Sequence, residues 1–226
     1  MQRGSYDRGV QPAAVLFDLD GVLVDSEHLW DRIRRETVDA HGGRWTEGAT
    51  EAMMGMSTPE WSRYVVAELG AQLTPEQAAE TVIDGMAEVY RNDPPVLPGA
   101  AETLRTIAAE YRTAIASSAP PRIIRAFLES AGATVGYTIS SEEVGAGKPA
   151  PDVYLEAARG LDVSAAESVA VEDSSNGLRA AAASGATVFA VPNAHFPPAE
   201  DALAGAYRVL GDISELPEAL RDLARG

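Results

Sequence analysis

Two aspartates, Asp18 and Asp20, follow a short apolar run in the stretch AAVLFDLDG. The run, residues 13–17, predicts a buried β-strand, so both carboxylates are expected near its carboxyl end. Two charges placed there lose hydration and repel one another, which a chain tolerates when a metal ion lies beside them. Gly21 allows a sharp exit from the strand, so the carboxylates can face an open crevice. Taken alone, the stretch is equally well interpreted as a strand that ends in a polar Asp-Gly turn.

Polar residues also follow three later apolar segments. Ser117 and Ser118 come after the second predicted strand, and Lys148 lies in the loop after the third. Glu172 and Asp173 end the fourth. Each of these has an ordinary alternative: serines or an acidic pair that cap the next helix, and a solvated lysine. Ligands of parallel α/β sheets collect at the carboxyl ends of the strands, so four such ends in order favour a common site.

The residue types at these strand ends suit magnesium and phosphate. Mg²⁺ prefers hard oxygen ligands, takes one or two carboxylates directly and keeps several waters. The candidate metal ligands are Asp18, Asp20, Glu172 and Asp173. Lys148 and the Ser117 hydroxyl can hold phosphate oxygens that the metal does not reach, and backbone N–H groups after Asp18 complete the cradle.

Composition narrows the partners. The 226 residues carry a formal net charge of −16, which argues against nucleic acid or an anionic membrane surface, because those partners need a basic face. The absence of cysteine excludes disulfides, thiolate catalysis and cysteine zinc sites, and the three histidines share no metal-ligand spacing. No stretch has the length of a signal peptide core or a membrane span. We therefore expect a cytoplasmic protein, either a monomer or a weak homodimer.

Predicted helices and strands alternate from residue 100 onward. Strands are expected over 113–116, 137–140, 168–171, 187–191 and 207–210, with helices over 100–110, 121–131, 151–160, 175–184 and at the C-terminus. Residues 28–97 are largely helical in pattern and interrupt this alternation after the first strand. The predicted fold is α/β, with a doubly wound parallel-sheet (Rossmann-like) core and an inserted small α-helical cap domain. Its parts are a flexible tail (1–12), the core (13–27 and 98–226) and the cap (28–97).

Four segments carry a family resemblance: FDLDGVLVDSE, AIASSA, GKPAPDVY and VEDSSNG. They are similar to the four successive motifs of the haloacid dehalogenase superfamily, above all to its capped branch of sugar-phosphate phosphatases and β-phosphoglucomutases. The resemblance covers nearly the whole chain beyond the tail. It implies Asp18 as the nucleophile, Asp20 as the general acid/base, and Ser117 and Lys148 as the phosphate-binding pair. It also implies a Mg²⁺ site completed by the acidic pair at the fourth motif, with Asp173 as a ligand. Dehalogenases that resemble this family lack the second aspartate, which is present here.

The resemblance implies a Mg²⁺-dependent phosphatase that hydrolyses a small phosphomonoester, of sugar- or polyol-phosphate type, through an aspartyl-phosphate. One alternative is a β-phosphoglucomutase-like phosphomutase. A further alternative is a non-enzymatic phospho-acceptor domain, since receiver domains also gather acidic residues, a Ser or Thr and a lysine around Mg²⁺. Receivers accept phosphate on a later strand and have neither an acid/base two residues after the nucleophile nor an inserted cap, so the residue order disfavours them.

In this family the cap largely selects the substrate. The phosphoglucomutase pattern has a lysine before the cap glycine and an arginine a few residues on, which hold a second phosphate, whereas this chain has Met54 and Thr58. Trp30 replaces the histidine of the first cap helix. The residues expected to contact substrate are Gly21, Ser118, Trp30, Met54, Gly55 and Asn176.

The methionines and tryptophans of the cap predict a substrate face with little charge. Alternatively, Met53, Met56, Trp61 and Trp30 are only packing between helices, which we favour for Met53 and Trp61. His28, Arg34 and Arg63 are cations close in sequence that can supply charge from another angle. Without a strong second anion site, we expect inorganic phosphate to be released and no interconversion of β-glucose 1-phosphate and glucose 6-phosphate.

Overall fold

A six-stranded parallel sheet forms the centre of the molecule, in the order β3-β2-β1-β4-β5-β6. The computed structural model describes residues 11–53, 56–193 and 197–225, and most of the predicted tail lies outside them. The strands are β1 (Ala14–Phe17), β2 (Arg112–Ser117), β3 (Tyr137–Ser140), β4 (Ser168–Glu172), β5 (Thr187–Ala190) and β6 (Arg208–Val209). The predicted doubly wound α/β class is confirmed. β6 is shorter than the predicted strand 207–210, because it is an edge strand that pairs with β5 over only two residues.

The sequence of β1 explains its central place in the sheet. Its four residues are all buried and pair with β2 on one side and β4 on the other. Val15 and Phe17 belong to one hydrophobic cluster, and Ala14 and Leu16 to the other, so the strand is apolar on both faces. The residues that follow it are thereby fixed at the middle of the sheet's carboxyl edge.

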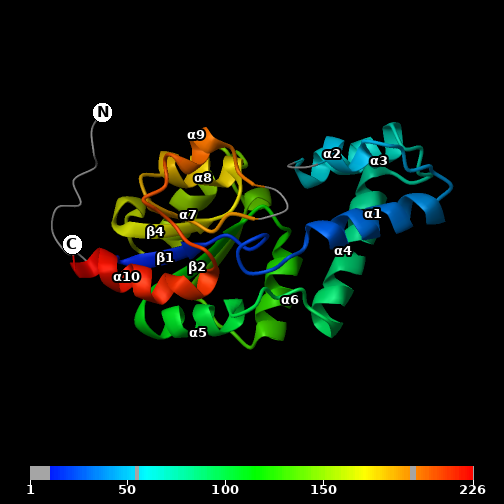
Figure 1. The fold of residues 1–226 in the computed structure, drawn as a ribbon. Coiled ribbons are helices and arrows are strands. Elements are labelled where there is room, and N and C mark those ends of the chain that lie inside the picture. Colours follow the sequence, from blue (N-terminus) through cyan, green and yellow to red (C-terminus); the bar gives the residue numbers. More distant parts are fainter. Residues whose placement is uncertain (1–10, 54–55, 194–196, 226) are drawn as a thin grey trace.

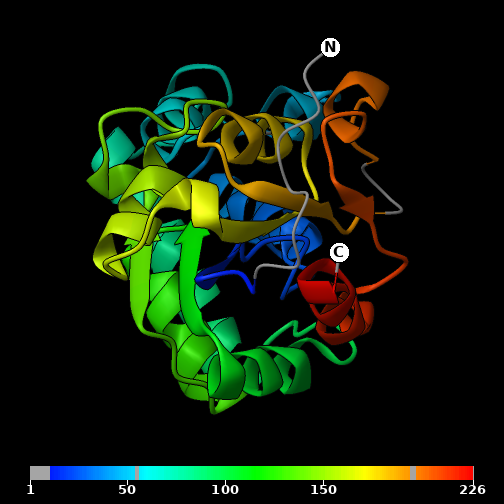
Figure 2. The ribbon, with the colours of Figure 1, turned by 90° about the vertical axis from the view of Figure 1, so that its left-hand side faces the viewer.

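Helices cover both faces of the sheet, as Figure 2 shows. The helices α5 (Ala100–Glu110), α6 (Pro121–Ala131) and α10 (Leu216–Arg225) share the hydrophobic cluster of Phe17. The helices α7 (Asp152–Gly160) and α8 (Ser175–Ala183), with the short α9 (Glu200–Leu203), share the cluster of Leu16. Among the helices described, none combines the length and the apolar character that crossing a membrane requires.

Four helices are inserted between β1 and α5, and we call them the cap: α1 (Glu27–Ala40), α2 (Ala49–Met53), α3 (Thr58–Ala67) and α4 (Pro75–Asn92). They extend to one side of the sheet, and α4 packs against α6 (Figure 1). Local capping sets their starts: Thr74 caps α4 in a capping box with Gln77, and Ser57 caps α3 with Glu60. The boundaries 28–97 of a cap domain stay a prediction.

The chain enters and leaves the cap through two connections that lie side by side. Val24 and Val96 form an antiparallel bridge, and the Asp25 N–H donates a 2.8 Å hydrogen bond to the Pro95 carbonyl. The first connection begins only a few residues after Asp20. The cap is therefore anchored next to the carboxyl end of β1.

Candidate active site

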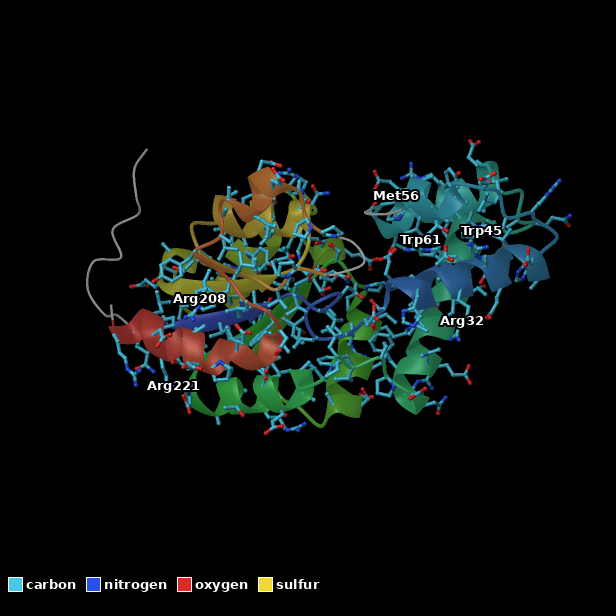
Figure 3. All side chains as sticks on the ribbon, viewed as in Figure 1. Arg32, Trp45, Met56, Trp61, Arg208 and Arg221 are labelled. Atoms are coloured by element: carbon cyan, nitrogen blue, oxygen red, sulfur yellow. The ribbon has the colours of Figure 1, made fainter. Side chains whose placement is uncertain are left out.

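A cavity of about 400 Å³ lies where the carboxyl ends of β1 and β4 meet the cap. The predicted site residues that line it are Asp18, Asp20, Gly21, Trp30, Ser118, Lys148, Asp173 and Asn176. The cap adds Glu27, Arg34, Met53, Met56, Thr58 and Trp61. Figure 3 shows Met56 and Trp61 in the part of the cap nearer the sheet, with Trp45 farther away. Two predicted contacts, Met54 and Gly55, lie outside the described residues.

Lys148 is buried among carboxylates. Its Nζ lies 2.8 Å from Oδ1 of Asp18 and 2.6 Å from Oε1 of Glu172, and 5.1 Å from the ring centroid of Tyr154. Burial alone would lower the pKa of Lys148, but Asp18 and Glu172 outweigh it and raise the pKa above its usual value. The lysine therefore stays charged at the floor of the cavity, and the alternative of a solvated lysine is wrong.

Glu172 is fully buried and its oxygens are already occupied by donors. Oε1 accepts hydrogen bonds from Lys148 (2.6 Å) and the Tyr154 hydroxyl (2.8 Å). Oε2 accepts from the Asp173 N–H (3.0 Å) and from the N–H and hydroxyl of Ser174 (both 3.2 Å). A Cβ on Gly177 would overlap this carboxylate. Glu172 thus positions Lys148, and its oxygens are less available to a metal than those of Asp173.

Asp18 and Asp173 are the carboxylates best placed for a metal ion. With Glu172 they offer oxygens within 4.8 Å of one another. Burial raises the pKa of Asp18 to about 7, with Lys148 lowering it and Glu172 and Asp20 raising it. Burial, then Glu172 and Asp18, raise the pKa of Asp173 well above its usual value. An excess of buried carboxylates over cations suits a hard divalent ion such as Mg²⁺.

Gly21 makes room for this arrangement. Its φ is +79°, a conformation that favours glycine, and a Cβ there would overlap the carboxylate of Asp173. The glycine therefore allows the turn after β1 to approach the carboxyl end of β4. This close approach supports the interpretation of the Asp-Gly pair as part of a site, which stays a prediction.

Asp20 has a different environment from the three clustered carboxylates. Its Oδ1 accepts a short hydrogen bond from the hydroxyl of Ser26, the residue before α1. Burial raises the pKa of Asp20, while hydrogen bonds from Ser26 and Trp30 oppose the shift. A carboxyl group balanced in this way suits proton transfer. The prediction that Asp20 also binds the metal stays a prediction.

Comparison with known proteins decides the family. The model described as haloacid dehalogenase-like hydrolase matches residues 12–185, more than half of the chain. The chain belongs to the haloacid dehalogenase-like hydrolases. This confirms the predicted superfamily and the prediction of an enzyme, and it leaves no place for the non-enzymatic receiver alternative.

Relatives of this hydrolase include a protein named as a phosphatase of phosphorylated carbohydrates. Protein CbbY of Rhodobacter capsulatus is 31% identical over 204 residues, which cover 80% of this chain and 85% of that protein. The "Phosphorylated carbohydrates phosphatase" of Thermotoga maritima is 29% identical, covering 76% of this chain and 81% of its own. The crystal structure of CbbY from Rhodobacter sphaeroides in complex with phosphate has a TM-score of 0.81 at 28% identity, covering 93% of this chain and 99% of that one.

The two serines after β2 have different surroundings: Ser117 is the predicted phosphate-binding residue, and Ser118 is a predicted substrate contact. Ser117 is fully buried, and its hydroxyl accepts a 3.0 Å hydrogen bond from the Ala119 N–H. Ser118 is exposed at the cavity. The alternative that they cap α6 is wrong, since its cap residue is Pro120. Their roles toward phosphate stay predictions.

Sequence reasoning missed two partners of the catalytic groups. They are Ser26, whose hydroxyl contacts Asp20, and Tyr154, whose hydroxyl contacts Glu172; both lie within the segments that carry the family resemblance, which assigns them no role. Arg34 was recorded as a nearby cation, yet it lines the cavity. The expected tryptophans and methionines line the cavity, and Met53 and Trp61 do so besides being buried. Glu27 and Arg34 add charge to the cap side of the cavity, whereas the sequence predicted a substrate face with little charge. The signal for Arg34 was its spacing, four residues after Trp30 on one helix face.

Proposed function

We propose that this hydrolase is a Mg²⁺-dependent phosphatase that removes the phosphoryl group from a small sugar- or polyol-phosphate. The observation that carries the proposal is the pairing of Asp18 with buried Lys148, in one cavity with Asp20 and Asp173. A cavity of about 400 Å³ suits a small metabolite. The relative named for phosphorylated carbohydrates supports the same substrate class.

Asp18 acts as the nucleophile in this proposal. Its carboxylate attacks phosphorus in line, the bond from phosphorus to the leaving oxygen breaks, and an aspartyl-phosphate forms on Asp18. Asp20 gives its proton to the leaving oxygen, so the departing alcohol leaves neutral. Lys148 stabilises the negative charge on the transferring phosphoryl oxygens, and its contact with Glu172 holds it in place.

Water completes the cycle. Asp20, now ionised, accepts a proton from a water molecule that attacks phosphorus, which releases inorganic phosphate and restores the Asp18 carboxylate. Mg²⁺, held by Asp18 and Asp173, would supply positive charge that reduces the repulsion between these carboxylates and the phosphate. The turn at Gly21 keeps the two carboxylates close enough for this.

The test is a free-phosphate assay on a panel of sugar and polyol phosphates, with Mg²⁺ or with EDTA. Phosphate release that needs Mg²⁺ and vanishes in Asp18→Asn is the expected result. Acid quenching during turnover, followed by mass spectrometry, is expected to find a phosphoryl group on the peptide that contains Asp18. No release from any member of the panel would refute the proposal.

A phosphomutase is distinguished in the same samples. β-Glucose 1-phosphate, primed with glucose 1,6-bisphosphate, is assayed for glucose 6-phosphate beside free phosphate. We expect phosphate without isomer, because Asp20 serves water in the second half-reaction. Glucose 6-phosphate that forms much faster than free phosphate would overturn the proposal of hydrolysis. The cytoplasmic location and the monomeric or weakly dimeric state remain part of this proposal, to be tested by fractionation and by light scattering.

A further inference from the structure

Arg34 is a buried cation on the cap side of the cavity. It lies on the inner face of α1, four residues after Trp30, and only 9% of its surface is exposed. It lines the same cavity as Asp18 and Lys148. Arginine is seldom buried to this degree unless it is paired, so the position calls for an explanation.

Two tryptophans enclose the guanidinium. Its Cζ lies 5.2 Å from the ring centroid of Trp30 and 4.9 Å from that of Trp61, which comes from α3. The two ring centroids are 6.4 Å apart with an interplanar angle of 55°. Contacts with both rings favour the cation and limit its rotation. The side chain is therefore held in place before any ligand arrives.

The aromatic contacts leave the hydrogen-bonding capacity of Arg34 unused. Its Nε is buried and has no hydrogen-bond partner, and the guanidinium forms no ion pair within the described part of the chain. Burial lowers the pKa of Arg34, although Glu27, Asp31 and Asp20 raise it from longer range. A buried guanidinium without a direct anionic partner is unfavourable, because its lost hydration is not replaced.

The neighbouring arginine shows the usual arrangement. Arg35 also lies over a tryptophan, 4.9 Å from the ring centroid of Trp45. It is half-exposed, forms a 3.1 Å ion pair with Asp31 and does not line the cavity. Arg34 differs in having a buried Nε without a hydrogen-bond partner and, among the described residues, no carboxylate within ion-pair distance.

We propose that Arg34 binds an oxyanion at the end of the substrate remote from the transferred phosphoryl group, so that the preferred substrate carries two anionic groups. The inference rests on the proposed phosphatase activity. A planar guanidinium binds carboxylate or phosphate with two parallel hydrogen bonds, and both ligands share this chemistry. Thr58, which also lines the cavity, provides a hydroxyl but no charge. Arg34 thus supplies the positive charge that the sequence lacks at positions 54 and 58.

Matched substrates test the inference. One pair, glycerol 3-phosphate and 3-phosphoglycerate, differs by a remote carboxylate. The other pair, fructose 6-phosphate and fructose 1,6-bisphosphate, differs by a remote phosphate. The wild type is expected to prefer the member with two anionic groups, in at least one pair, by tenfold or more in kcat/KM. Which pair shows the preference identifies the oxyanion.

The variants are Arg34→Met, which keeps length and burial, and Arg34→Lys, which keeps only charge. Arg34→Met is expected to lower kcat/KM about 100-fold for the preferred substrate with two anionic groups, and less than threefold for the member of the pair with one. Arg34→Lys should recover only part of the loss. The control Arg35→Met should leave both values within twofold. Equal losses on both members of a pair, or no preference in the wild type, would overturn the inference.

Two measurements separate this inference from the proposed activity and from a structural role. Calorimetric titration of the wild type with Ca²⁺ in place of Mg²⁺, using 3-phosphoglycerate and fructose 1,6-bisphosphate, needs no turnover, because Ca²⁺ is expected to bind without supporting hydrolysis. Binding weakened tenfold or more by Arg34→Met is expected even if no substrate is hydrolysed. Absence of binding by both probes would refute the inference. Without ligand, Arg34→Met should unfold at the same or a higher temperature than the wild type. A lower midpoint together with unchanged substrate preference would assign Arg34 a packing role instead.

Discussion

Replacing Asp18 by asparagine removes one negative charge from a buried group of carboxylates, two of which, Asp18 and Glu172, contact Lys148. The two side chains have nearly the same shape, so packing against the sheet changes little. Turnover should be lost, because an amide cannot form the aspartyl-phosphate. Stability should rise in the absence of metal, because the site no longer holds a charge that its surroundings disfavour.

The magnitude follows from the pKa of Asp18. Burial raises it from 3.8 to about 7, even with Lys148 in contact. Because the folded-state pKa is raised, the associated stability is complete below the unfolded pKa and is lost as the pH rises through 7. One pKa unit corresponds to about 1.4 kcal/mol. Relative to its value below the unfolded pKa, the free energy of unfolding of the wild type is therefore lower by at most about 2 kcal/mol near pH 5 and about 4 kcal/mol near pH 8. The amide of the variant does not titrate, so the advantage of Asp18→Asn should grow between these two pH values.

The assay is urea unfolding in EDTA near pH 5 and pH 8, for the wild type, Asp18→Asn and Asp39→Asn. Asp39 is exposed on α1, so its variant makes the same chemical change without burial and should shift the free energy of unfolding by less than about 0.5 kcal/mol. Adding Mg²⁺ should stabilise the wild type more than Asp18→Asn. An Asp18→Asn protein less stable than the wild type near pH 8, or a difference that does not depend on pH, would refute the reasoning. Activity within tenfold of the wild type would remove Asp18 as the nucleophile.

Three further predictions concern the metal, a glycine and a hydroxyl group. EDTA should suppress phosphate release reversibly, and Ca²⁺ should bind but inhibit, because its longer bonds to oxygen misplace the reacting groups. Full activity after exhaustive chelation would contradict the proposed metal site. Gly21→Ala should abolish turnover and lower the free energy of unfolding more than the control Gly48→Ala, because Gly48 has a similar φ of +84° but its Cβ would meet open space. Gly48→Ala should lower the free energy of unfolding by about 1–2 kcal/mol, and equal effects of the two substitutions would argue against the close approach of Gly21 to Asp173. Ser26→Ala should raise the pKa of Asp20, because the lost hydroxyl stabilises the ionised carboxylate by about 1 kcal/mol. The basic limb of the kcat/KM–pH profile, where Asp20 loses its proton, should therefore move upward by up to about one pH unit, and a downward shift would contradict this role.

The sequence predicted the features that depend on local pattern. Apolar runs bounded by turn residues located β1 through β5, and the rule that parallel strands present their carboxyl ends at one edge brought Asp18, Lys148 and Asp173 together. Lys148 lies at the carboxyl edge of the sheet, as predicted from its position in the loop after the third strand, although none of its contacts was predicted.

Contacts between distant elements could not be predicted in the same way. The hydrogen bond from the Tyr154 hydroxyl to Glu172 depends on how α7 packs on β1, β2 and β3, and no local pattern encodes that packing. Arg34 shows the same limit, because the sequence offered it only as one of three cations, with His28 and Arg63, that can supply charge to the site. The two tryptophans that enclose Arg34 come from different helices, so the folded cap is needed to show that this cation lines the cavity.

The paired connections at Val24 and Val96 also bear on how the protein folds. β1 and β2 are neighbours in the sheet, yet Ala14 and Arg112 are 98 positions apart along the chain. Once the cap helices form and the Val24–Val96 bridge closes, the remaining loop between the strands is only about 26 positions long. The entropic cost of closing a loop grows with the logarithm of its length, so the bridge lowers this cost by about 1 kcal/mol. Insertions or deletions within the cap should therefore change the rate of sheet formation little, which leaves the cap free to diverge while the sheet keeps its pairing.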